Sequence, residues 1–346
     1  QMCIRDRSYI QIMIIKTIAF PRAALIGNPS DGYFGKTIAF TFSDFQTDIT
    51  LYPSDHIRIL PMTRDRTVFD DIEDFRDDVA RYGYYGGIRI IKASIARFLA
   101  YCRKKELSID GDNFTLRCHT SIPAHLGLAG SSSIITAVFR ALMKYYDVAI
   151  PLHEMANEIW ATEIEELGIS GGLQDRVAQS YQGITYMDFN ETLMKTRGNG
   201  EYHPLNSESL PNIYLAYDVR AAESSDIVHN NLRYRFDQGD EDVVSAMKEF
   251  AGLADRVKEM FESGDYSGLA DTINANFNLR SSICDISRRN QELVHTARST
   301  GASAKFTGSG GAIIGTFADA EELASLKNTL SDIGAEVIVP TIAWPE

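Results

Sequence analysis

The distribution of apolar and polar residues along the chain predicts its strands. Alternation of the two kinds, or a short apolar run, is typical of strands. Such stretches are MIIKTIAF at 13–20, FTFSDFQTDITLY at 40–52, NFTLRCHTSIP at 113–123, NIYLAYDV at 212–219 and AEVIVP at 335–340. The segment KTIAF occurs at Lys16–Phe20 and again at Lys36–Phe40, and two copies do not indicate a repeat protein.

Other stretches show the helical period. Between Gly86 and Lys105, apolar residues at helical spacing (Ile88, Ile91, Ile95, Phe98 and Leu99) predict an amphipathic helix. We expect further helices over residues 134–146, 151–168, 241–263, 266–278 and 319–333, and a short one at the end of SGGLQDRVAQSYQG, residues 170–183. Residues 64–81 are rich in Asp and Arg and are expected to form a solvated surface excursion.

The order of these elements indicates the fold class. Strands come first, then helices, then helices with a late pair of strands, which favours an α+β protein over a regularly alternating doubly wound sheet. We expect two domains, residues 13–195 and 205–346, on either side of a polar stretch. The first strand starts naturally at Met13, so residues 1–12 are expected to be a non-native or disordered leader.

Composition and charge narrow the classes of function. Of the 346 residues, 44% are hydrophobic and 23% charged, an ordinary globular balance. The formal net charge of -13 argues against nucleic-acid binding, which needs a dense Lys/Arg face. No apolar run approaches the ~20 residues that cross a bilayer, so no membrane partner is expected. The cysteines are far apart, which favours isolated thiols and a cytoplasmic location (Cys3, Cys102, Cys118 and Cys284).

The stretch HLGLAGSSSIITA, residues 125–137, places glycines and serines directly before a predicted helix. Gly127 and Gly130 can adopt positive φ and let a ligand approach the backbone. The serines at 131–133 lie where the helix starts, and the free N–H groups and the helix dipole there favour an anion such as phosphate. No Lys follows in the Walker A pattern. A turn followed by an ordinary Ser N-cap is the alternative interpretation.

A second glycine loop lies in FTGSGGAII, residues 306–314. The turn between its strand-like flanks is a further place where a ligand can approach the backbone. The alternative is a glycine-rich bend that joins two strands. Two hydroxyl-rich glycine loops with different flanks together favour one ligand bound between two domains.

Two carboxylates are candidates for the two acidic roles that phosphoryl transfer to an alcohol requires. Glu163 lies on a helix with an apolar face, and Asp175 follows a pair of glycines. One carboxylate can hold Mg²⁺ while the other handles the hydroxyl proton. Glu165 and Glu166 compete for the metal role, and a solvated acidic helix end is the alternative.

The loop PRAALIGNPSDGYFG, residues 21–35, carries a mixture of donors, an acceptor and a planar ring. That mixture suits a polyhydroxylated ligand, and the side chains concerned are those of Arg22, Asn28, Ser30, Asp31 and Tyr33. Asx-type turns around Pro29 are the alternative.

Taken in order, these stretches resemble the motifs of the GHMP kinases, the family of galactokinase, homoserine kinase, mevalonate kinase and phosphomevalonate kinase. RAALIGNPSDGYFG is similar to the first, substrate-side motif, PAHLGLAGSSS to the phosphate-binding second motif, and FTGSGGAII to the third. The resemblance implies a two-domain fold, with an N-terminal domain like ribosomal protein S5 domain 2 and a C-terminal ferredoxin-like α/β sandwich.

Within the family, LIGNPSDGYFGKTIA, LGISGGLQDRVAQSYQG and AKFTGSGGA resemble the plant-type glucuronokinases. The implied reaction is ATP-dependent phosphorylation of a uronic acid at its anomeric hydroxyl, which converts glucuronate to glucuronate 1-phosphate. Lys36 stands where that subgroup has Arg, and Ser133 where the family usually has Ala. These departures leave the reaction class unchanged.

The resemblance also implies roles for individual residues. Asp175 becomes the catalytic acidic residue with Arg22 beside it, and Ser132 and Glu163 become the Mg²⁺ ligands. Substrate contacts are implied for Asn28, Ser30, Asp31, Tyr33 and Arg176. ATP contacts are implied for Gly127, Leu128, Ala129, Gly130, Ser131, Ser132, Ser133, Thr307, Gly308, Ser309, Gly310 and Gly311. The expected partners are ATP and a small sugar acid, and the chain is expected to be a monomer or a homodimer.

A uronate carboxylate needs a cation that a neutral sugar does not need. Arg176, Lys36, Arg220 and Arg233 are the candidates, and Arg is favoured for bidentate pairing. Other interpretations stay open. The chain can be a GHMP kinase for galactose, arabinose or a heptose, a non-catalytic relative that senses sugar and ATP, or an unrelated α+β binding protein with structural glycine loops.

Overall fold

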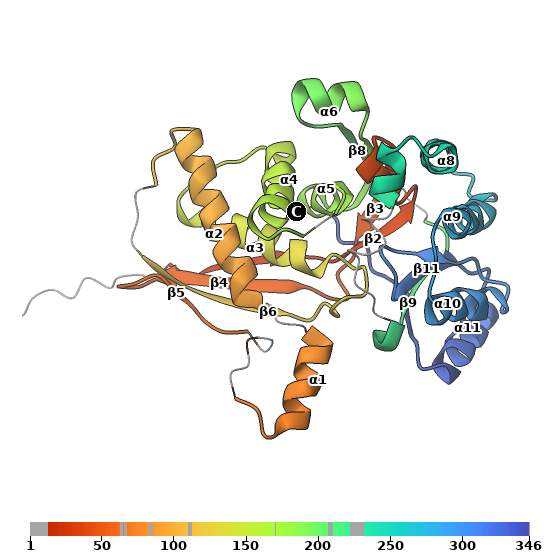
Figure 1. Cartoon of the computed structure of the whole chain (residues 1–346), viewed down its shortest axis with the longest axis horizontal. Coiled ribbons are helices and arrows are strands. Elements are labelled where there is room, and N and C mark those ends of the chain that lie inside the picture. The colour runs from red at the N-terminus through yellow and green to blue at the C-terminus, as the bar shows by residue number, and fades with distance from the viewer. Residues whose placement is uncertain are drawn as a thin grey trace, which may run out of the picture.

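A computed structural model of the chain describes residues 13–62, 65, 68–82, 86–109, 113–169, 171–206, 210–221 and 232–345. The predicted leader at residues 1–12 lies outside these residues. The described residues form three four-stranded sheets, with helices packed on each of them. The molecule is elongated, and the sheets follow one another along its long axis (Figure 1).

The first sheet has the strand order β1-β4-β6-β5. Its strands are β1 (Ile15–Ala19), β4 (Thr47–Pro53), β5 (Arg58–Ile59) and β6 (Phe114–Thr120). Neighbouring strands run antiparallel except β5 and β6, which are parallel. The helices α2 (Gly87–Lys104) and α3 (Gly130–Tyr145) bury their apolar faces together with this sheet in one core. This core fixes the start of α3, where the serines lie.

The second sheet has the order β2-β3-β7-β8 and lies in the middle of the molecule. Its strands are β2 (Arg22–Ile26), β3 (Lys36–Thr41), β7 (Ile184–Asp188) and β8 (Glu201–Leu205), all antiparallel to their neighbours. Successive side chains of a strand point to opposite faces. Ile38 and Phe40 therefore share a core with α8 (Glu241–Ser263) and α9 (Leu269–Ile283). Ala39 packs instead with α4 (Leu152–Ala161) and α5 (Gln174–Tyr181).

The third sheet is antiparallel, with the order β10-β11-β9-β12. Its strands are β9 (Ile213–Tyr217), β10 (Lys305–Phe306), β11 (Ala312–Thr316) and β12 (Glu336–Ile338). The C-terminal helices are α8 (Glu241–Ser263), α9 (Leu269–Ile283), α10 (Arg288–Arg298) and α11 (Ala320–Asp332). One core contains residues of β2, β3, α8, α9 and β11, so the second and third sheets are joined by apolar packing.

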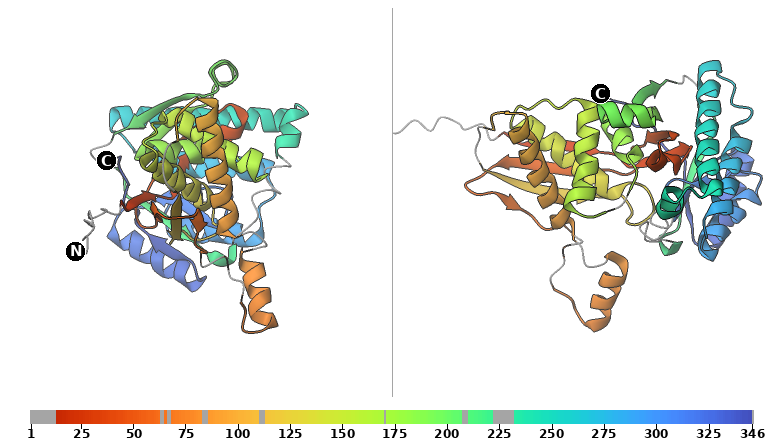
Figure 2. Two further views of the ribbon diagram at one scale, coloured as in Figure 1. Left: turned by 90° about the vertical axis from the view of Figure 1, so that its left-hand side faces the viewer. Right: turned by 45° about the horizontal axis from the view of Figure 1, so that its top comes forward.

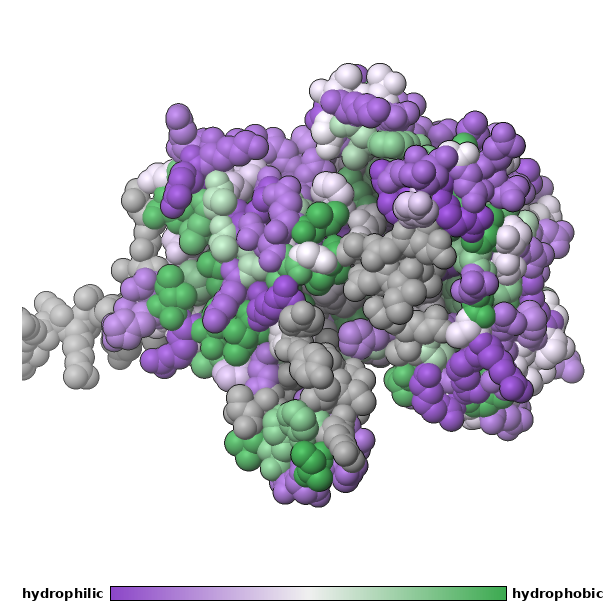
Figure 3. All heavy atoms as spheres, in the orientation of Figure 1, coloured by the Kyte–Doolittle hydropathy of each residue, from purple (hydrophilic) through white to green (hydrophobic). Residues whose placement is uncertain are grey.

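Shorter elements complete the chain. They are a 3-10 turn at Ser30–Tyr33, α1 (Ile72–Tyr82), a π-helical turn at Thr162–Glu166, α6 (Glu191–Arg197), a 3-10 turn at Val219–Ala221 and a helical stretch at 232–237. The surface excursion predicted at residues 64–81 contains α1, which stands away from the rest of the molecule (Figures 1 and 2). Apolar side chains of this projection are visible in Figure 3, and Val68, Ile72 and Phe75 are exposed.

The α+β fold class and most of the predicted elements are confirmed. The predicted helix at 241–263 matches α8, but α3 begins at Gly130 and so includes the serines that were expected to precede it. The two KTIAF segments form β1 and β3 in different sheets. β8 extends the second sheet to Leu205, and the chain returns to that sheet where Ile342 forms a bridge with Phe42.

Two further expectations concern the cysteines and membranes. Cys102, Cys118 and Cys284 are free thiols, as predicted, and Cys3 lies outside the described residues. Among the described residues, no helix has the length and apolar character that a membrane span requires.

Candidate active site

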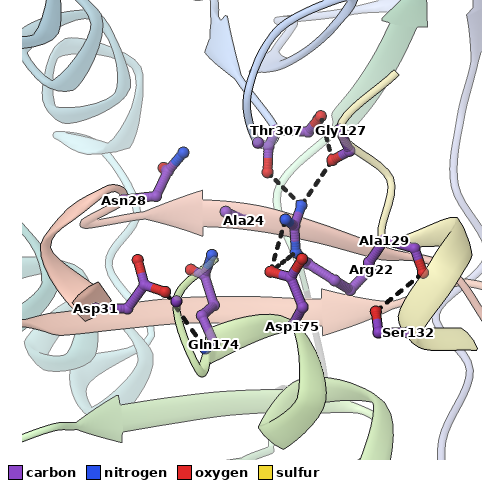
Figure 4. Close-up of polar contacts among 12 residues, drawn as sticks. Arg22, Ala24, Asn28, Asp31, Gly127, Ala129, Ser132, Gln174, Asp175 and Thr307 are labelled. Atoms are coloured by element: carbon purple, nitrogen blue, oxygen red, sulfur yellow. Dashed lines mark hydrogen bonds and ion pairs between the residues drawn. The ribbon is translucent and has the colours of Figure 1, made fainter. Parts of the chain in front are cut away.

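Arg22, the first residue of β2, joins three segments that lie far apart in the sequence. Its Nε donates to Asp175 Oδ1 at 2.7 Å, and its Nη1 donates to the main-chain oxygens of Gly127 at 2.8 Å and Thr307 at 2.6 Å. Only 5% of the Arg22 side chain is exposed. Figure 4 shows these contacts converging on the guanidinium. A buried guanidinium held by ionised and carbonyl acceptors is rigid, so the predicted catalytic pair is fixed beside both glycine loops.

Asp175 lies in the first turn of α5, where the positive end of the helix dipole favours a carboxylate. Its Oδ1 accepts from Arg22, and its Oδ2 lies 3.7 Å from Arg176 Nη1. The side chain is 18% exposed, against 1% for Glu163. Asp175 is therefore the more accessible carboxylate of the pair.

The two glycine loops touch each other beside Arg22. Gly127 has a φ of 63°, and a Cβ added to it would lie 2.8 Å from Ser309 N. A Cβ on Gly308 would lie 2.4 Å from Gly127 O. No side chain fits into either contact, so the close approach of the loops accounts for glycine at both positions.

The N-terminus of α3 has the backbone geometry predicted for a phosphate site. The helix begins at Gly130, directly after Ala129, which has a left-handed φ of 61°. The first N–H groups of a helix have no partner within the helix, and together with the dipole they favour an anion. These N–H groups lie next to the loop contact between Gly127 and Gly308.

The hydroxyls of the three serines at the start of α3 point in different directions. Ser131 Oγ donates to Glu163 Oε1 at 2.6 Å. Ser132 Oγ is buried and donates to Ala129 O at 3.2 Å, and Ser133 Oγ donates to Gly130 O at 2.7 Å. Ser131, and not Ser132, is therefore the serine that contacts Glu163, while the Mg²⁺ ligand role predicted for Ser132 stays a prediction. Consecutive helical residues are about 100° apart around the axis, so only one of three serines can face that carboxylate.

Glu163 is fully buried in the π-helical turn between α4 and α5. Its oxygens accept from Ser131 Oγ and from the guanidinium of Arg176. The two competing carboxylates are on the outside of the turn, since Glu165 pairs with Arg97 at the surface and Glu166 is exposed. π-turns inside helices often occur at functional sites, and this one directs Glu163 inward.

Arg176 does not have the position of a sugar ligand. It is 4% exposed, and it donates to Glu163 and to Gly172 O. Burial, and in second place the charge of Arg22, lower the pKa of Arg176 to about 9. The guanidinium is thus the counter-ion of Glu163, and these contacts do not support the substrate contact predicted for Arg176.

In the loop after β2, Asp31 faces the site. Its Oδ2 accepts from Gln174 N at 3.4 Å, and a Cβ on Gly172 would lie 1.7 Å from that oxygen. Burial, and next the negative charge of Asp175, raise the pKa of Asp31 to about 6. Asp31 and Asp175 therefore form a pair of interacting carboxylates on the acceptor side of the site.

The other predicted acceptor residues shape the loop. Asn28 Oδ1 accepts from Lys305 Nζ at 2.6 Å, after which the chain passes through a cis peptide bond to Pro29. Ser30 is fully buried, and its Oγ donates to Lys36 O and accepts from Lys36 N. Tyr33 is 7% exposed and packs on Phe236, with ring centres 4.9 Å apart. Their side chains hold the loop in place, so the structure does not support direct sugar contacts for these three.

Lys305 is a residue that sequence reasoning missed. It is 1% exposed, and its Nζ donates to Ala24 O, Asn28 Oδ1 and Phe306 O at 2.6–2.8 Å. Burial lowers its pKa, whereas three acceptors at these distances match the three donors of an ammonium group. A Lys directly before the third motif, in a strand that is otherwise apolar, was the available signal.

The loop of the third motif is held by side chains that bond its main chain. Arg280 donates to Gly308 O at 2.7 Å and Ser309 O at 3.1 Å, and Gly311 N donates to Asn290 Oδ1 at 2.8 Å. Arg280 and Asn290 lie on α9 and α10. The C-terminal helices therefore fix the loop that touches Gly127.

The chain is similar to known proteins over most of its length. A family model described as "GHMP kinases N terminal domain" matches residues 89–183. Glucuronokinase 1 of Arabidopsis thaliana is 37% identical over 302 residues, which cover 86% of this chain and 83% of that protein. Probable glucuronokinase 2 of the same plant is 40% identical, with coverages of 86% and 82%. The chain belongs to the GHMP kinase family.

Solved structures show the same GHMP kinase fold at low sequence identity. A Lin0012 protein from Listeria innocua gives a TM-score of 0.77 at 13% identity, covering 96% of this chain and 98% of that one. Lactococcus lactis galactokinase complexed with galactose gives a TM-score of 0.70 at 16% identity, with coverages of 95% and 93%. Because identity is this low, these two structures establish the shared architecture of the GHMP kinase and not its acceptor.

Proposed function

We propose that this chain is an ATP-dependent sugar kinase that phosphorylates the anomeric hydroxyl of a uronic acid, with glucuronate as the first candidate. The observation that carries the proposal is the ion pair of Arg22 and Asp175. Arg22 also bonds Gly127 O and Thr307 O, so the pair lies where the phosphate loop, residues 125–133, meets the third motif. The relatives named glucuronokinase, at 37% and 40% identity, support a uronic acid as the acceptor.

Asp175 receives the reacting hydroxyl. The transition state of phosphoryl transfer is loose, so little prior deprotonation of the alcohol is needed. Arg22 contacts Oδ1 of Asp175, so Oδ2 is the oxygen that orients the sugar hydroxyl. The same carboxylate accepts the proton of that hydroxyl late in the transfer. Its place in the first turn of α5 fixes the direction of that oxygen.

Arg22 and the start of α3 stabilise the negative charge of the transferring group. The Arg22 guanidinium lies between Asp175 and Gly127 O, and so between the acceptor side and the phosphate loop. Donors that are already in place when charge develops need no reorganisation, and this is usually the largest part of catalysis. The main-chain N–H groups from Gly130 onward are such donors for the ATP phosphates.

Mg²⁺ fits beside Ser131 and Glu163. A hydroxyl and a carboxylate oxygen 2.6 Å apart are the hard ligands that Mg²⁺ prefers, with nucleotide phosphates as the remaining ligands. When bound, Mg²⁺ neutralises phosphate charge. In this proposal Ser131 replaces Ser132 as its ligand.

The contacts of the four candidate cations favour Arg233 as the partner of a uronate carboxylate. Arg176 is paired with the buried Glu163. Lys36 Nζ donates to Asp255 at 2.8 Å, and Arg220 is paired with Asp218 beside the third sheet. Arg233 also has an acidic partner, since its Nε donates to Asp237 Oδ2 at 3.0 Å, but both side chains of this pair are about half exposed and such surface pairs are weak. What distinguishes Arg233 is that its Nη1 donates to Gly32 O, in the loop after β2, at 3.2 Å.

Replacement of this guanidinium tests the assignment. Arg233→Met is expected to raise KM for glucuronate by about tenfold to a hundredfold, as for a lost charged hydrogen bond, with KM for ATP unchanged. Arg117→Met, an exposed change on β6, is the control. An unchanged KM for glucuronate in Arg233→Met would remove Arg233 from the site.

The acceptor itself is tested by measuring ADP release with glucuronate, galacturonate, galactose, arabinose and mannose. We expect release with glucuronate and much less with the neutral sugars. Release with neutral sugars alone would contradict the uronic acid while leaving the kinase in place. No release with any sugar, despite ATP binding, would indicate a non-catalytic relative.

A further inference from the structure

The side chain of Gln174 has no role in the mechanism described above, yet it lies inside the site. It is the first residue of α5 and directly precedes Asp175. The residue is 3% exposed, and its Oε1 is buried without a hydrogen-bond partner among the described residues. By contrast, the neighbouring Glu163 has partners for both of its oxygens. A buried polar atom without a partner is costly, and a bound ligand that supplies the partner explains it.

The carboxamide of Gln174 stands between two carboxylates. In the view of Figure 4, the end of the Gln174 side chain is drawn between the carboxyl groups of Asp31 and Asp175. The main chain fixes this arrangement, since Gln174 N donates to Asp31 Oδ2 at 3.4 Å and Asp175 is the next residue of the helix. The preceding loop is held by Trp160 Nε1, which donates to Gly171 O at 3.0 Å.

The chemistry of the three groups suits a row of hydroxyls. An ionised carboxylate only accepts hydrogen bonds, whereas a carboxamide offers an acceptor and two donors. The buried Oε1 of Gln174 has no partner among the described residues, so it can accept a hydrogen bond from a sugar hydroxyl. Asp175, Gln174 and Asp31 thus present alternating groups to three consecutive positions of a sugar.

We propose that Gln174 binds the hydroxyl adjacent to the one that is phosphorylated. Asp175 takes the anomeric hydroxyl, Gln174 the 2-hydroxyl and Asp31 a hydroxyl beyond it. This assignment rests on the proposed function, because it takes the anomeric hydroxyl of a sugar as the acceptor. A site that leaves a buried polar group unpaired when the hydroxyl is missing discriminates strongly against the deoxy analogue. Gln174 therefore makes the kinase selective for sugars with a hydroxyl at C2.

The test compares glucuronate with 2-deoxyglucuronate in wild type and in Gln174→Leu. In wild type, kcat/KM for the deoxy sugar is expected to be lower by about tenfold or more. In Gln174→Leu, kcat/KM for glucuronate should fall by about tenfold through KM, while the value for the deoxy sugar and KM for ATP stay within about twofold. Gln291→Leu, an exposed change on α10, is the control and should change neither value.

Several outcomes would contradict the role of Gln174. An equal loss with both sugars would indicate a structural role, and unchanged turnover of glucuronate in Gln174→Leu would exclude a contact. If Gln174→Leu does not fold, Gln174→Met serves in the same comparison. Wild-type turnover is measured first. If another sugar is accepted instead of glucuronate, the proposed acceptor fails, and that sugar and its 2-deoxy analogue then test Gln174.

Discussion

Asp175 and Arg22 form the only direct link in the proposed mechanism between the acceptor hydroxyl and the phosphate loop. Asp175→Asn keeps the shape of the side chain but removes its negative charge. We expect turnover to fall by about 10²- to 10⁴-fold, the usual range for a lost acid–base group, while the Kd for ATP changes by less than about threefold. Asp147→Asn, in an exposed turn after α3, is the matched control. Near wild-type turnover of Asp175→Asn would contradict the catalytic assignment.

The different directions of the serines give a second prediction. Ser131→Ala removes the hydroxyl 2.6 Å from Glu163 and is expected to raise the Mg²⁺ concentration for half-maximal activity by about tenfold, as for one lost ligand hydrogen bond or coordination contact. Ser132→Ala removes a hydroxyl that bonds Ala129 O within the turn, so its Mg²⁺ requirement should match that of wild type. The reverse result would restore Ser132 as the metal ligand.

The raised pKa of Asp31 predicts a pH dependence of sugar binding. With a pKa of about 6, Asp31 takes up a proton as the pH falls through that value and ceases to be a pure acceptor. We therefore expect kcat/KM for the sugar to fall below about pH 6, by up to tenfold per pH unit, with KM for ATP unaffected. In Asp31→Asn this acid limb should be absent. An acid limb that persists in Asp31→Asn would show that another group titrates.

The same shift has a consequence for stability. The folded protein binds a proton at Asp31 at a higher pH than the unfolded chain, whose Asp has a pKa near 3.8. Ionised Asp31 therefore destabilises the fold above about pH 6, and its contribution becomes more favourable as the pH falls towards 4. The charge of Asp175 is part of the cause, so Asp175→Asn should lower the pKa of Asp31, as measured by carboxyl-group NMR titration.

At the scale of elements, the contact between the two glycine loops determines how closely the third motif approaches the phosphate loop. Gly308→Ala would place a Cβ 2.4 Å from Gly127 O, and a main-chain atom cannot move away as a flexible side chain can. We expect a lower Tm and a KM for ATP raised by about tenfold or more, because separated loops no longer fit the nucleotide. Gly252→Ala, in α8 with no atom within 4 Å of the new Cβ, is the control.

The control has an expected sign of its own. Gly inside a helix is less favourable than Ala by about 1 kcal/mol, so Gly252→Ala should raise Tm slightly and leave both KM values unchanged. A Gly308→Ala variant with wild-type KM for ATP would show that the loops need not touch for nucleotide binding.

The sequence predicts helices well where apolar residues recur at regular spacing. It predicts less well which way a side chain points when one turn of the backbone determines that direction. The apolar residues of α2 and α8 recur at helical spacing over many residues, and these helices appear where they were expected. In contrast, which of the serines contacts Glu163 depends on where α3 starts. Ala129 in a left-handed conformation moves that start to Gly130, and nothing in the periodicity specifies it.

The acceptor loop shows the same limit. Asn28, Ser30, Asp31 and Tyr33 are all polar or aromatic residues of one loop, and their types alone do not tell inward from outward. Ser30 is buried against the main chain of Lys36, whereas Asp31 faces α5. Long-range partners decide these directions, and Lys305, far along the chain, holds Asn28.

At the scale of the whole molecule, the site depends on segments from both ends of the chain. Arg22 and Asp175 come from the second sheet and the helix packed on it, while Thr307 belongs to the loop of the third sheet. The apolar core shared by α8, α9 and the second sheet holds these parts together. Catalysis therefore depends on the packing of the central and C-terminal sheets as well as on the residues that touch the substrates.

The central claim is phosphorylation of a uronic acid at its anomeric hydroxyl. The most direct measurement is ³¹P NMR of the product formed from ATP and glucuronate, with proton coupling to identify the phosphorylated carbon. We expect a phosphate monoester coupled to the anomeric proton, in amounts equal to the ADP released, and none with Asp175→Asn. A monoester on another carbon, or product from neutral sugars with none from glucuronate, would contradict the account.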